Sequence, residues 1–337
     1  MTDPVAIGAL PDGRQVQAVT LDNGRLRVTV WDHGARLHDV RMAGHGSSFV
    51  LGAREPEMYG SLLSTFGAII GPVANRIRDA GFEIDGTIYK VEAGTNGHCL
   101  HSESAGLHGK IWEIAEILPD AVTLALDLPH GEGGFPGNRH VRARYALDGT
   151  TLRLDLSATT DRATPMSLTH HPYWTMQDPE SWGGQTLWID AAHYLPVDDE
   201  TIPTGEIAPV GDTGYDFRNP RRLDPDAVPP LDHNFCLAQA PRDLTPCLRL
   251  TGPETGLTLE IATTAPGLQV FDMRPFSIED EPTLHGHPYP AGAALAMEPQ
   301  MWPDALGRSD WPGIVLRPGD TWRLAVEYRL SAGDQAG

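Results

Sequence analysis

The chain has 337 residues, and 45 acidic side chains stand against 25 basic ones, so the formal net charge is −20 at pH 7. A charge of this sign repels nucleic-acid backbones and anionic membrane surfaces, and no local cluster of basic residues offsets it. We therefore expect no nucleic-acid partner, and no membrane segment either, because no apolar run approaches the roughly 18 residues of a membrane span.

Short segments of strand-like sequence, separated by turn residues, follow one another along the whole chain. Where apolar and polar residues alternate, the period is that of a half-buried strand, and intervening Asp, Asn and Gly residues favour tight turns. In chain order the expected hairpins pair 16–21 with 26–31, 82–84 with 87–91, 141–147 with 151–159, 248–250 with 257–262, and 314–316 with 322–330. Helical patterning is scarce, and one short helix is expected over 57–66.

This succession of strands predicts an all-β fold, either an antiparallel sandwich or a barrel. No segment of low complexity divides the chain, so we expect a single domain over residues 1–337. The proline-rich stretch 220–230 is expected to be a long surface loop rather than a domain boundary.

The first residues and the cysteines bear on the compartment. The N-terminal sequence lacks a basic stretch followed by an apolar run, so no secretory signal is expected. Cys99, Cys236 and Cys247 are odd in number and lack CxxC spacing. That pattern argues against a disulfide framework and favours a reducing compartment, so we expect a cytoplasmic protein.

Several common functional motifs are missing from the sequence. It contains no phosphate-binding GxxxxGK[ST] loop, no GxGxxG after a strand and no HExxH. The segment 97–101 brings two histidines and a cysteine together. Zinc sites need four ligands with recognisable spacing, and the remaining ligands are not apparent, so we expect no metal and no cofactor.

The polar residues that stand out are those embedded in apolar or turn-rich segments. Glu298 is the most notable, because an ionised carboxylate within an apolar stretch is costly unless it is paired or functional. The others are Asn75, Arg76, His101, His170, His171, Asp232 and Gln269. Each has a structural alternative: an arginine can pair with a structural carboxylate, a histidine can close a strand, and an aspartate can make a local turn.

Five segments together resemble the motifs of the aldose 1-epimerase (galactose mutarotase) family, and they occur in that family's order. They are Ala74-Asn75-Arg76-Ile77, Leu168-Thr169-His170-His171-Pro172-Tyr173-Trp174, Asp232-His233-Asn234-Phe235, Pro266-Gly267-Leu268-Gln269 and Glu298-Pro299-Gln300-Met301-Trp302-Pro303-Asp304. The resemblance spans residues 26–328 and implies a large antiparallel β-sandwich. It also implies an enzyme that interconverts the α and β anomers of a free aldose by opening and reclosing the sugar ring.

The resemblance assigns roles to individual side chains. Glu298 is expected to remove the proton of the anomeric hydroxyl, and His171 to protonate the ring oxygen, with the roles reversed on closure. Contacts to the sugar are expected from Asn75, Arg76, His101, Tyr173, Asp232 and Gln269. Trp174 and Trp302 are expected either to line the cleft or to fill the core. The implied partner is a small sugar, and the expected oligomeric state is a monomer or weak dimer.

The chain departs from the family at the acid motif, and other functions stay open. Where the family commonly has Asn-His-Ser-Tyr-Phe, this chain has His170-His171-Pro172-Tyr173-Trp174, so His170 is a second candidate for the acid. One alternative is a hexose-phosphate mutarotase, although the one adjacent arginine pair, Arg221-Arg222, is expected in a loop. The others are a non-catalytic carbohydrate-binding protein on the same fold, and a glycoside hydrolase that uses Asp232 and Glu298.

Overall fold

The computed structural model describes residues 3–60, 63–94, 96–253, 256–279 and 283–332. Within these ranges the chain forms β-strands joined by turns, and its helices are short 3-10 turns. These are η1 (Pro56–Gly60), η2 (Arg78–Ala80), η3 (Glu103–Ala105), η4 (Leu107–Gly109) and η5 (Glu132–Gly134). Among the described residues, no helix has the length and apolar character needed to cross a membrane.

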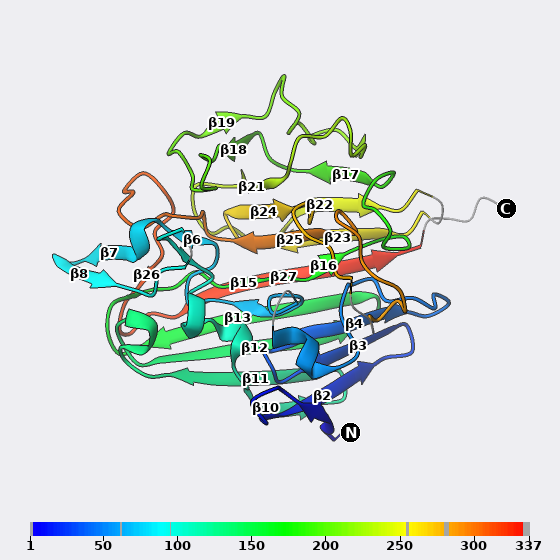
Figure 1. Ribbon diagram of the computed structural model, residues 1–337, viewed down its shortest axis with the longest axis horizontal. Coiled ribbons are helices and arrows are strands. Elements are labelled where there is room, and N and C mark those ends of the chain that lie inside the picture. The colour runs from blue at the N-terminus through cyan, green and yellow to red at the C-terminus, as the bar shows by residue number, and fades with distance from the viewer. Residues whose placement is uncertain (1–2, 61–62, 95, 254–255, 280–282, 333–337) are drawn as a thin grey trace.

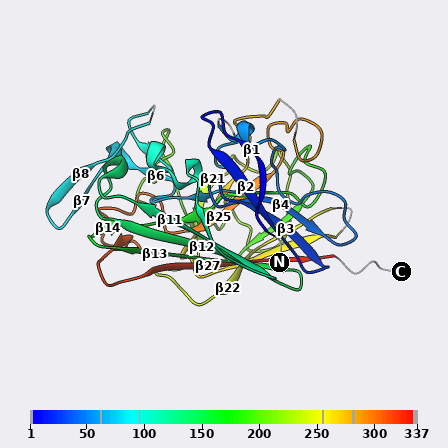
Figure 2. The same cartoon turned by 90° about the horizontal axis from the view of Figure 1, so that it is seen from below.

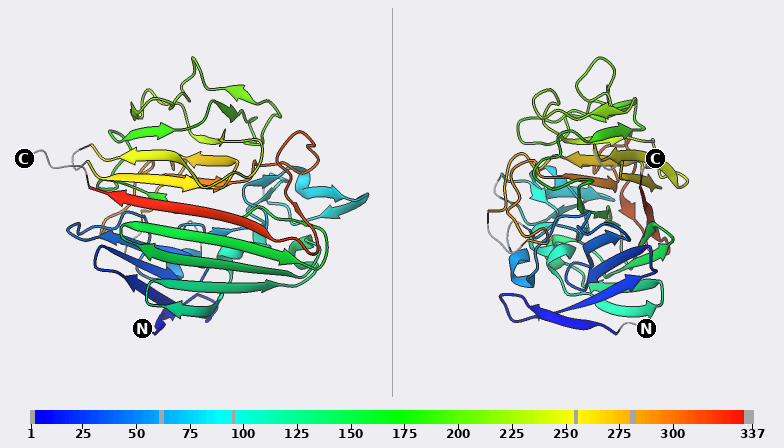
Figure 3. Two further views of the ribbon diagram at one scale, coloured as in Figure 1. Left: turned by 180° about the vertical axis from the view of Figure 1, so that it is seen from behind. Right: turned by 90° about the vertical axis from the view of Figure 1, so that its right-hand side faces the viewer.

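The largest sheet has nine antiparallel strands and forms one layer of the molecule (Figure 3). In spatial order it consists of β10 (Glu113–Leu118), β11 (Ala121–Leu128), β12 (Arg139–Asp148), β13 (Thr151–Thr160), β27 (Trp322–Ser331), β23 (Thr258–Thr263), β22 (Thr245–Thr251), β17 (Thr186–Ile189) and β20 (Arg221–Arg222). Side chains of β13 alternate between a buried leucine face and a partly exposed polar face, as the sequence period predicts.

A second sheet of six antiparallel strands positions most of the candidate site. In spatial order it consists of β16 (Tyr173–Trp174), β25 (Leu295–Gln300), β24 (Gly267–Phe271), β21 (Asp232–Cys236), β18 (His193–Leu195) and β19 (Ala208–Pro209). Figure 1 shows β25, β24 and β21 side by side. In β25, alternate residues Leu295 and Met297 pack in the main core, which leaves Glu298 on the opposite face.

The remaining strands form one sheet of four and several short pairs. The four-stranded sheet consists of β1 (Val5–Ala9), β2 (Gln15–Asp22), β3 (Leu26–Trp31) and β4 (Arg36–Met42). The short pairs are β5 (Ile69–Ile70) with β15 (Thr169–His170), β6 (Arg76–Ile77) with β9 (Cys99–Leu100), β7 (Gly81–Ile84) with β8 (Thr87–Lys90), and β14 (Thr164–Pro165) with β26 (Val315–Leu316).

The main hydrophobic core lies between the nine-stranded sheet and the other two sheets. It combines Val28 of β3, Leu154 of β13 and Met297 of β25, among many other buried apolar residues. Figure 2 shows the same layering from below, with β13, β27 and β22 on one side and β1–β4 and β25 on the other. The expected large antiparallel β-sandwich is therefore confirmed.

Four of the five predicted hairpins are confirmed, and the fifth is wrong. The pairs β2–β3, β7–β8, β12–β13 and β22–β23 form as expected. The expected pairing of 314–316 with 322–330 does not occur: β26 pairs with β14 instead. Both edges of β27 are already occupied by β13 and β23, so no edge remains for the preceding segment.

Two further local predictions need correction. The predicted helix over 57–66 is limited in the described residues to η1, followed by a turn at 63–67. The guanidinium of Arg36 binds the carbonyls of Leu63, Ser64 and Phe66, which are the groups that a helix would need for its own bonds. The pair Arg221-Arg222 forms the edge strand β20 rather than a loop.

Candidate active site

The expected site residues converge on a hollow of about 220 Å³ beside the six-stranded sheet, here called the site hollow. It is lined by Thr65, Asn75, Arg76, Leu100, His101, His171, Tyr173, Asp232, Gln269, Phe271, Phe276 and Glu298. All eight residues predicted from the sequence are in this set. They come from β6, β16, β21, β24 and β25 and from the residues next to β6, β9 and β15, so only the folded chain brings them together.

A histidine and a carboxylate face each other at the centre of the site hollow. His171 Nε2 lies 3.4 Å from Glu298 Oε1, and both residues are almost completely buried. Burial raises the pKa of Glu298 well above its ordinary value, and the negative charge of Asp232 raises it further while Arg76 lowers it. Burial also lowers the pKa of His171 to about 4. Burial therefore favours the neutral form of each group, and the two lie close enough to exchange a proton.

Both members of this pair keep an unused polar atom. Within the described part of the chain, neither Glu298 Oε2 nor His171 Nδ1 has a hydrogen-bond partner. Buried polar atoms in folded proteins are nearly always bonded, so such atoms in a hollow suit a ligand that supplies hydroxyl groups.

A second polar cluster fixes one wall of the site hollow. Gln269 Nε2 donates a hydrogen bond of 2.6 Å to Asp232 Oδ1, and an Arg76 guanidinium nitrogen lies 3.8 Å from Asp232 Oδ2. Gln269 stands directly opposite Glu298 in the β24–β25 register. Burial raises the pKa of Asp232, whereas Arg76 and Gln269 lower it. Asp232 thus lies within a strand and bonds across it, and the alternative of a local turn is wrong.

Asn75 and His101 hold each other in place by two hydrogen bonds. The amide of His101 donates to the Asn75 carbonyl at 2.8 Å, and the Asn75 amide donates to His101 Nδ1 at 3.2 Å. Because Nδ1 accepts, the neutral ring carries its proton on Nε2, where it is available to a ligand. Burial lowers the pKa of His101 well below its ordinary value.

The structure separates the two adjacent histidines. His171 lines the site hollow, whereas His170 is completely buried and bonds to Tyr328 and to the carbonyl of Gly67. Successive residues of an extended chain point to opposite sides, which explains the separation. Among the two candidates for the acid, geometry favours His171.

Four residues that line the site hollow were not predicted from the sequence: Thr65, Leu100, Phe271 and Phe276. A partial signal existed for Phe271, which lies two residues after Gln269 and so on the same face of β24. Leu100 is an unusually exposed leucine next to His101. Nothing in the sequence pattern distinguished Thr65 or Phe276. Trp174 and Trp302 fill the hydrophobic core and do not line the site hollow.

The two histidines and the cysteine of segment 97–101 lie in three different environments. His98 bonds to Glu200 and to the amide of Asp79, Cys99 is buried in the core, and His101 belongs to the site hollow. Within the described ranges, no group of three or more His, Cys, Asp or Glu side chains is arranged to hold a metal ion.

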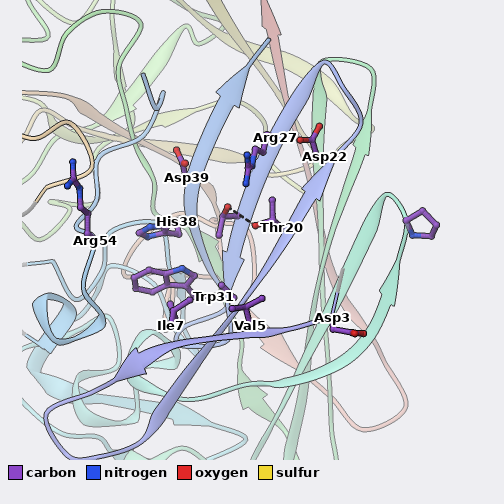
Figure 4. Close-up of a pocket in the computed structure, with 13 residues that line it drawn as sticks. Asp3, Val5, Ile7, Thr20, Asp22, Arg27, Trp31, His38, Asp39 and Arg54 are labelled. Atoms are coloured by element: carbon purple, nitrogen blue, oxygen red, sulfur yellow. Dashed lines mark hydrogen bonds between the residues drawn. The ribbon is translucent and has the colours of Figure 1, made fainter. Parts of the chain in front are cut away.

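A larger hollow of about 840 Å³ lies on the outer face of β2, β3 and β4 (Figure 4). Its wall carries exposed Arg27 and Arg54 beside Asp39. Its histidine, His38, stacks on Trp31 with ring centroids 3.9 Å apart and bonds to the Tyr59 hydroxyl. His38 is therefore engaged in packing, whereas the close pair of His171 and Glu298 lies in the smaller hollow.

Comparison with known proteins bears on the same site. A sequence model described as Aldose 1-epimerase matches residues 17–329. The chain is 33% identical to the galactose mutarotase of Homo sapiens and 30% identical to the aldose 1-epimerase of Escherichia coli, in each case over 96% of this chain and 97% of the other. An aldose epimerase homologue from C. elegans superposes with a TM-score of 0.88 at 27% identity, covering 95% of this chain and 100% of that one.

Proposed function

The chain belongs to the aldose 1-epimerase family, and we propose that it catalyses mutarotation of a free aldose, which makes it an isomerase. The observation that carries the proposal is the buried pair of His171 and Glu298, 3.4 Å apart and open to a hollow of sugar size. Mutarotation needs one base and one acid beside the anomeric centre, and it transfers no electrons to a cofactor.

In the proposed reaction, Glu298 takes the proton of the anomeric hydroxyl while His171 gives a proton to the ring oxygen. The bond between the anomeric carbon and the ring oxygen breaks, and the aldehyde forms. Rotation about C1–C2 followed by closure on the other face gives the second anomer. During closure His171 takes the proton of the hydroxyl that was formed from the ring oxygen, and Glu298 returns its proton to the aldehyde oxygen. Both side chains thereby regain their starting protonation states.

The shifted pKa values suit a pair that passes one proton back and forth. The productive form, with an ionised Glu298 and a protonated His171, contains the same number of protons as the form with both groups neutral. The positive charge of Arg76 lowers the pKa of Glu298 and so favours the ionised base. Hydroxyl groups of a bound sugar can bond to Glu298 Oε2 and His171 Nδ1, which further stabilises the charged pair.

The remaining polar residues have the chemistry of sugar ligands. Asp232 accepts hydrogen bonds from sugar hydroxyls, and Gln269 holds its carboxylate in place. Arg76 and His101 donate toward the oxygen that gains charge as the ring opens. We assign Asn75 and Tyr173 to the same binding surface, where Tyr173 stacks on Phe66.

A phosphorylated substrate is not favoured by the charges around the hollow. Arg76 is the one Lys or Arg side chain in the described lining. Arg221 of β20, the suggested phosphate ligand, instead donates to the carbonyl of Gly214, and its guanidinium stacks over the ring of Phe217. We propose a free sugar as the substrate and, because all three cysteines are unpaired, a reducing compartment such as the cytoplasm.

Polarimetry tests the proposal directly. Crystalline α-glucose or α-galactose is dissolved, and its optical rotation is followed with and without the protein. We expect a faster approach to an unchanged final rotation, with no release of new reducing ends from glycosides. An unchanged rate for every common aldose, combined with measurable sugar binding, would instead identify a non-catalytic carbohydrate-binding protein.

A further inference from the structure

His170 is a buried polar residue that the proposed reaction does not use. Its Nε2 lies 3.1 Å from the carbonyl oxygen of Gly67 and 3.4 Å from the Tyr145 hydroxyl, and its Nδ1 lies 2.9 Å from the Tyr328 hydroxyl. A carbonyl oxygen can only accept, so Nε2 carries the proton and donates it to Gly67, while Tyr328 donates to Nδ1. His170 thus connects β27 of the nine-stranded sheet to the turn 63–68, here called the support turn.

The support turn holds the backbone of His171 on both sides. The Gly67 amide donates to the His171 carbonyl at 2.9 Å, and the His171 amide donates to the Ala68 carbonyl at 3.0 Å. Gly67 has a φ of +68°, and a Cβ at this position would collide with the Leu37 carbonyl. A glycine is therefore required at the point where His170 and His171 both attach.

This backbone anchor contributes to the placement of the His171 ring. Catalytic histidines are commonly oriented by a hydrogen bond from the second ring nitrogen, but His171 Nδ1 has no partner among the described residues. Apart from its ion pair with Glu298, the ring is held by packing against His101 and Tyr173, at centroid distances of 5.5 and 5.1 Å. A shift of the backbone would therefore move the ring relative to Glu298.

A buried cation supports the other end of the turn. Arg36 is fully buried, and its guanidinium donates to the carbonyls of Leu63, Ser64 and Phe66. The Phe66 ring in turn stacks on Tyr173 at 3.9 Å. The Gly67 carbonyl at the end of the support turn accepts two hydrogen bonds, from the Leu37 amide at 2.8 Å and from His170 at 3.1 Å. Arg36 therefore holds the earlier carbonyls of the support turn, and Leu37 and His170 together hold its end.

We propose that His170 is a positioning residue, which holds the ring of His171 against Glu298 by donating a hydrogen bond to Gly67 of the support turn. The inference rests on the proposed function and extends it to a residue outside the site hollow. His170 contacts neither the sugar nor the reacting atoms, and it acts through Gly67 and the backbone of His171.

Two substitutions at position 170 separate positioning from simple space filling. In His170→Gln, an amide can still donate to Gly67 and accept from Tyr328, so we expect kcat within a few-fold of the wild type. His170→Leu keeps much of the volume but loses both bonds, so we expect kcat to fall about 10- to 100-fold, since misplacing a catalytic group by about 1 Å has effects of this size. KM should change less than kcat.

The pH profile provides a measurement that a purely structural role would not change. The titratable groups facing His171 are Glu298, His101, His108 and Tyr173. A loosened His171 is better hydrated, so its titration should move up from about 4 toward the ordinary histidine value in His170→Leu and stay in place in His170→Gln. As a control for lost stability, Leu154→Ala in β13 should lower the melting temperature without moving the profile.

An NMR titration of the His171 ring, in histidine-labelled protein, follows the same shift without relying on activity. If the wild type fails to accelerate mutarotation, the proposed function is wrong, while this titration still tests the positioning role. Equal kcat and equal titration of His171 in the wild type and His170→Leu would overturn the inference. If His170→Leu does not fold, Tyr328→Phe takes its place, with an expected loss in kcat of about 3- to 10-fold; an unchanged kcat and profile there would also overturn it.

Discussion

The six-stranded and nine-stranded sheets place the same residue type in opposite environments. Glu327 of β27 pairs with Arg153 at 3.1 Å and with Arg329 at 2.6 Å, and its side chain remains 15% exposed. The Glu298 side chain in β25 is 3% exposed, and its nearest basic partner, His171 at 3.4 Å, is kept largely neutral by burial. The first carboxylate keeps some contact with solvent and two arginine partners, whereas the second is enclosed by the residues of the site hollow. Burial and the choice of partner, rather than the residue type, therefore distinguish the proposed base from an ordinary ion-paired glutamate.

The largest expected effect is the loss of kcat when Glu298 is replaced, with Glu327 replaced for comparison. Glu298→Gln removes the base but keeps the shape of the site, so kcat for mutarotation should fall about 10²- to 10⁴-fold, the usual contribution of general acid–base catalysis. Sugar binding, followed by calorimetry, should persist. Glu327→Gln is the matched control and should leave kcat unchanged. An active Glu298→Gln enzyme would mean that the base has been assigned to the wrong residue.

The pH dependence of kcat/KM sharpens the contrast between buried and solvated groups. The active free enzyme holds one proton on the His171–Glu298 pair. On the acid side, activity should fall only as pH approaches about 4, where His171 gains a second proton. On the alkaline side it should fall as Glu298 loses its proton, at a pH well above the ordinary glutamate value. A fall on the acid side centred near pH 6.5, where a solvated histidine titrates, would contradict this account.

A smaller effect is expected from the aspartates of the two sheets. Asp232→Asn removes a charged acceptor from the site hollow, so KM should rise about 10-fold or more, because hydrogen bonds to charged groups contribute about 1.5–3 kcal/mol. The decrease in kcat should be smaller than the increase in KM. Asp155→Asn is the control, because Asp155 pairs with Arg153 on the partly exposed face of β13. Equal kinetics for the wild type and Asp232→Asn would exclude Asp232 from substrate binding.

The smallest effect concerns stability, and its sign should differ between the two sheets. Glu298→Met replaces a buried carboxyl that lacks a full set of hydrogen bonds, so it should raise the free energy of unfolding by about 1 kcal/mol. Glu327→Met breaks partly exposed ion pairs and should lower it by less than about 1 kcal/mol. Chemical denaturation measures both values, and a destabilised Glu298→Met would show that the carboxyl supports the fold.

Much of the nine-stranded sheet could be predicted from the sequence. In β12 and β13, alternating leucines and charged residues surround a turn, and local rules suffice because strand partners are neighbours in the chain. The same reasoning failed for 314–330, since the edges of β27 had been taken by strands distant in sequence. It also failed for the support turn, whose carbonyls bind Arg36 from another strand.

The amino-acid sequence by itself determined the strand-rich fold, the acidic surface and the identities of the eight expected site residues. Periodicity and turn chemistry are local properties, and the site motifs are short, so the strands and the motifs can be recognised from the sequence. The sequence favoured His171 over His170 as the acid, and the tertiary structure showed that His171 is the one that faces Glu298. Tertiary structure alone showed that Thr65, Leu100 and Phe276 complete the hollow. It also decided the shifted pKa values of the pair, because desolvation depends on every layer packed around a group and not on its neighbours in the chain.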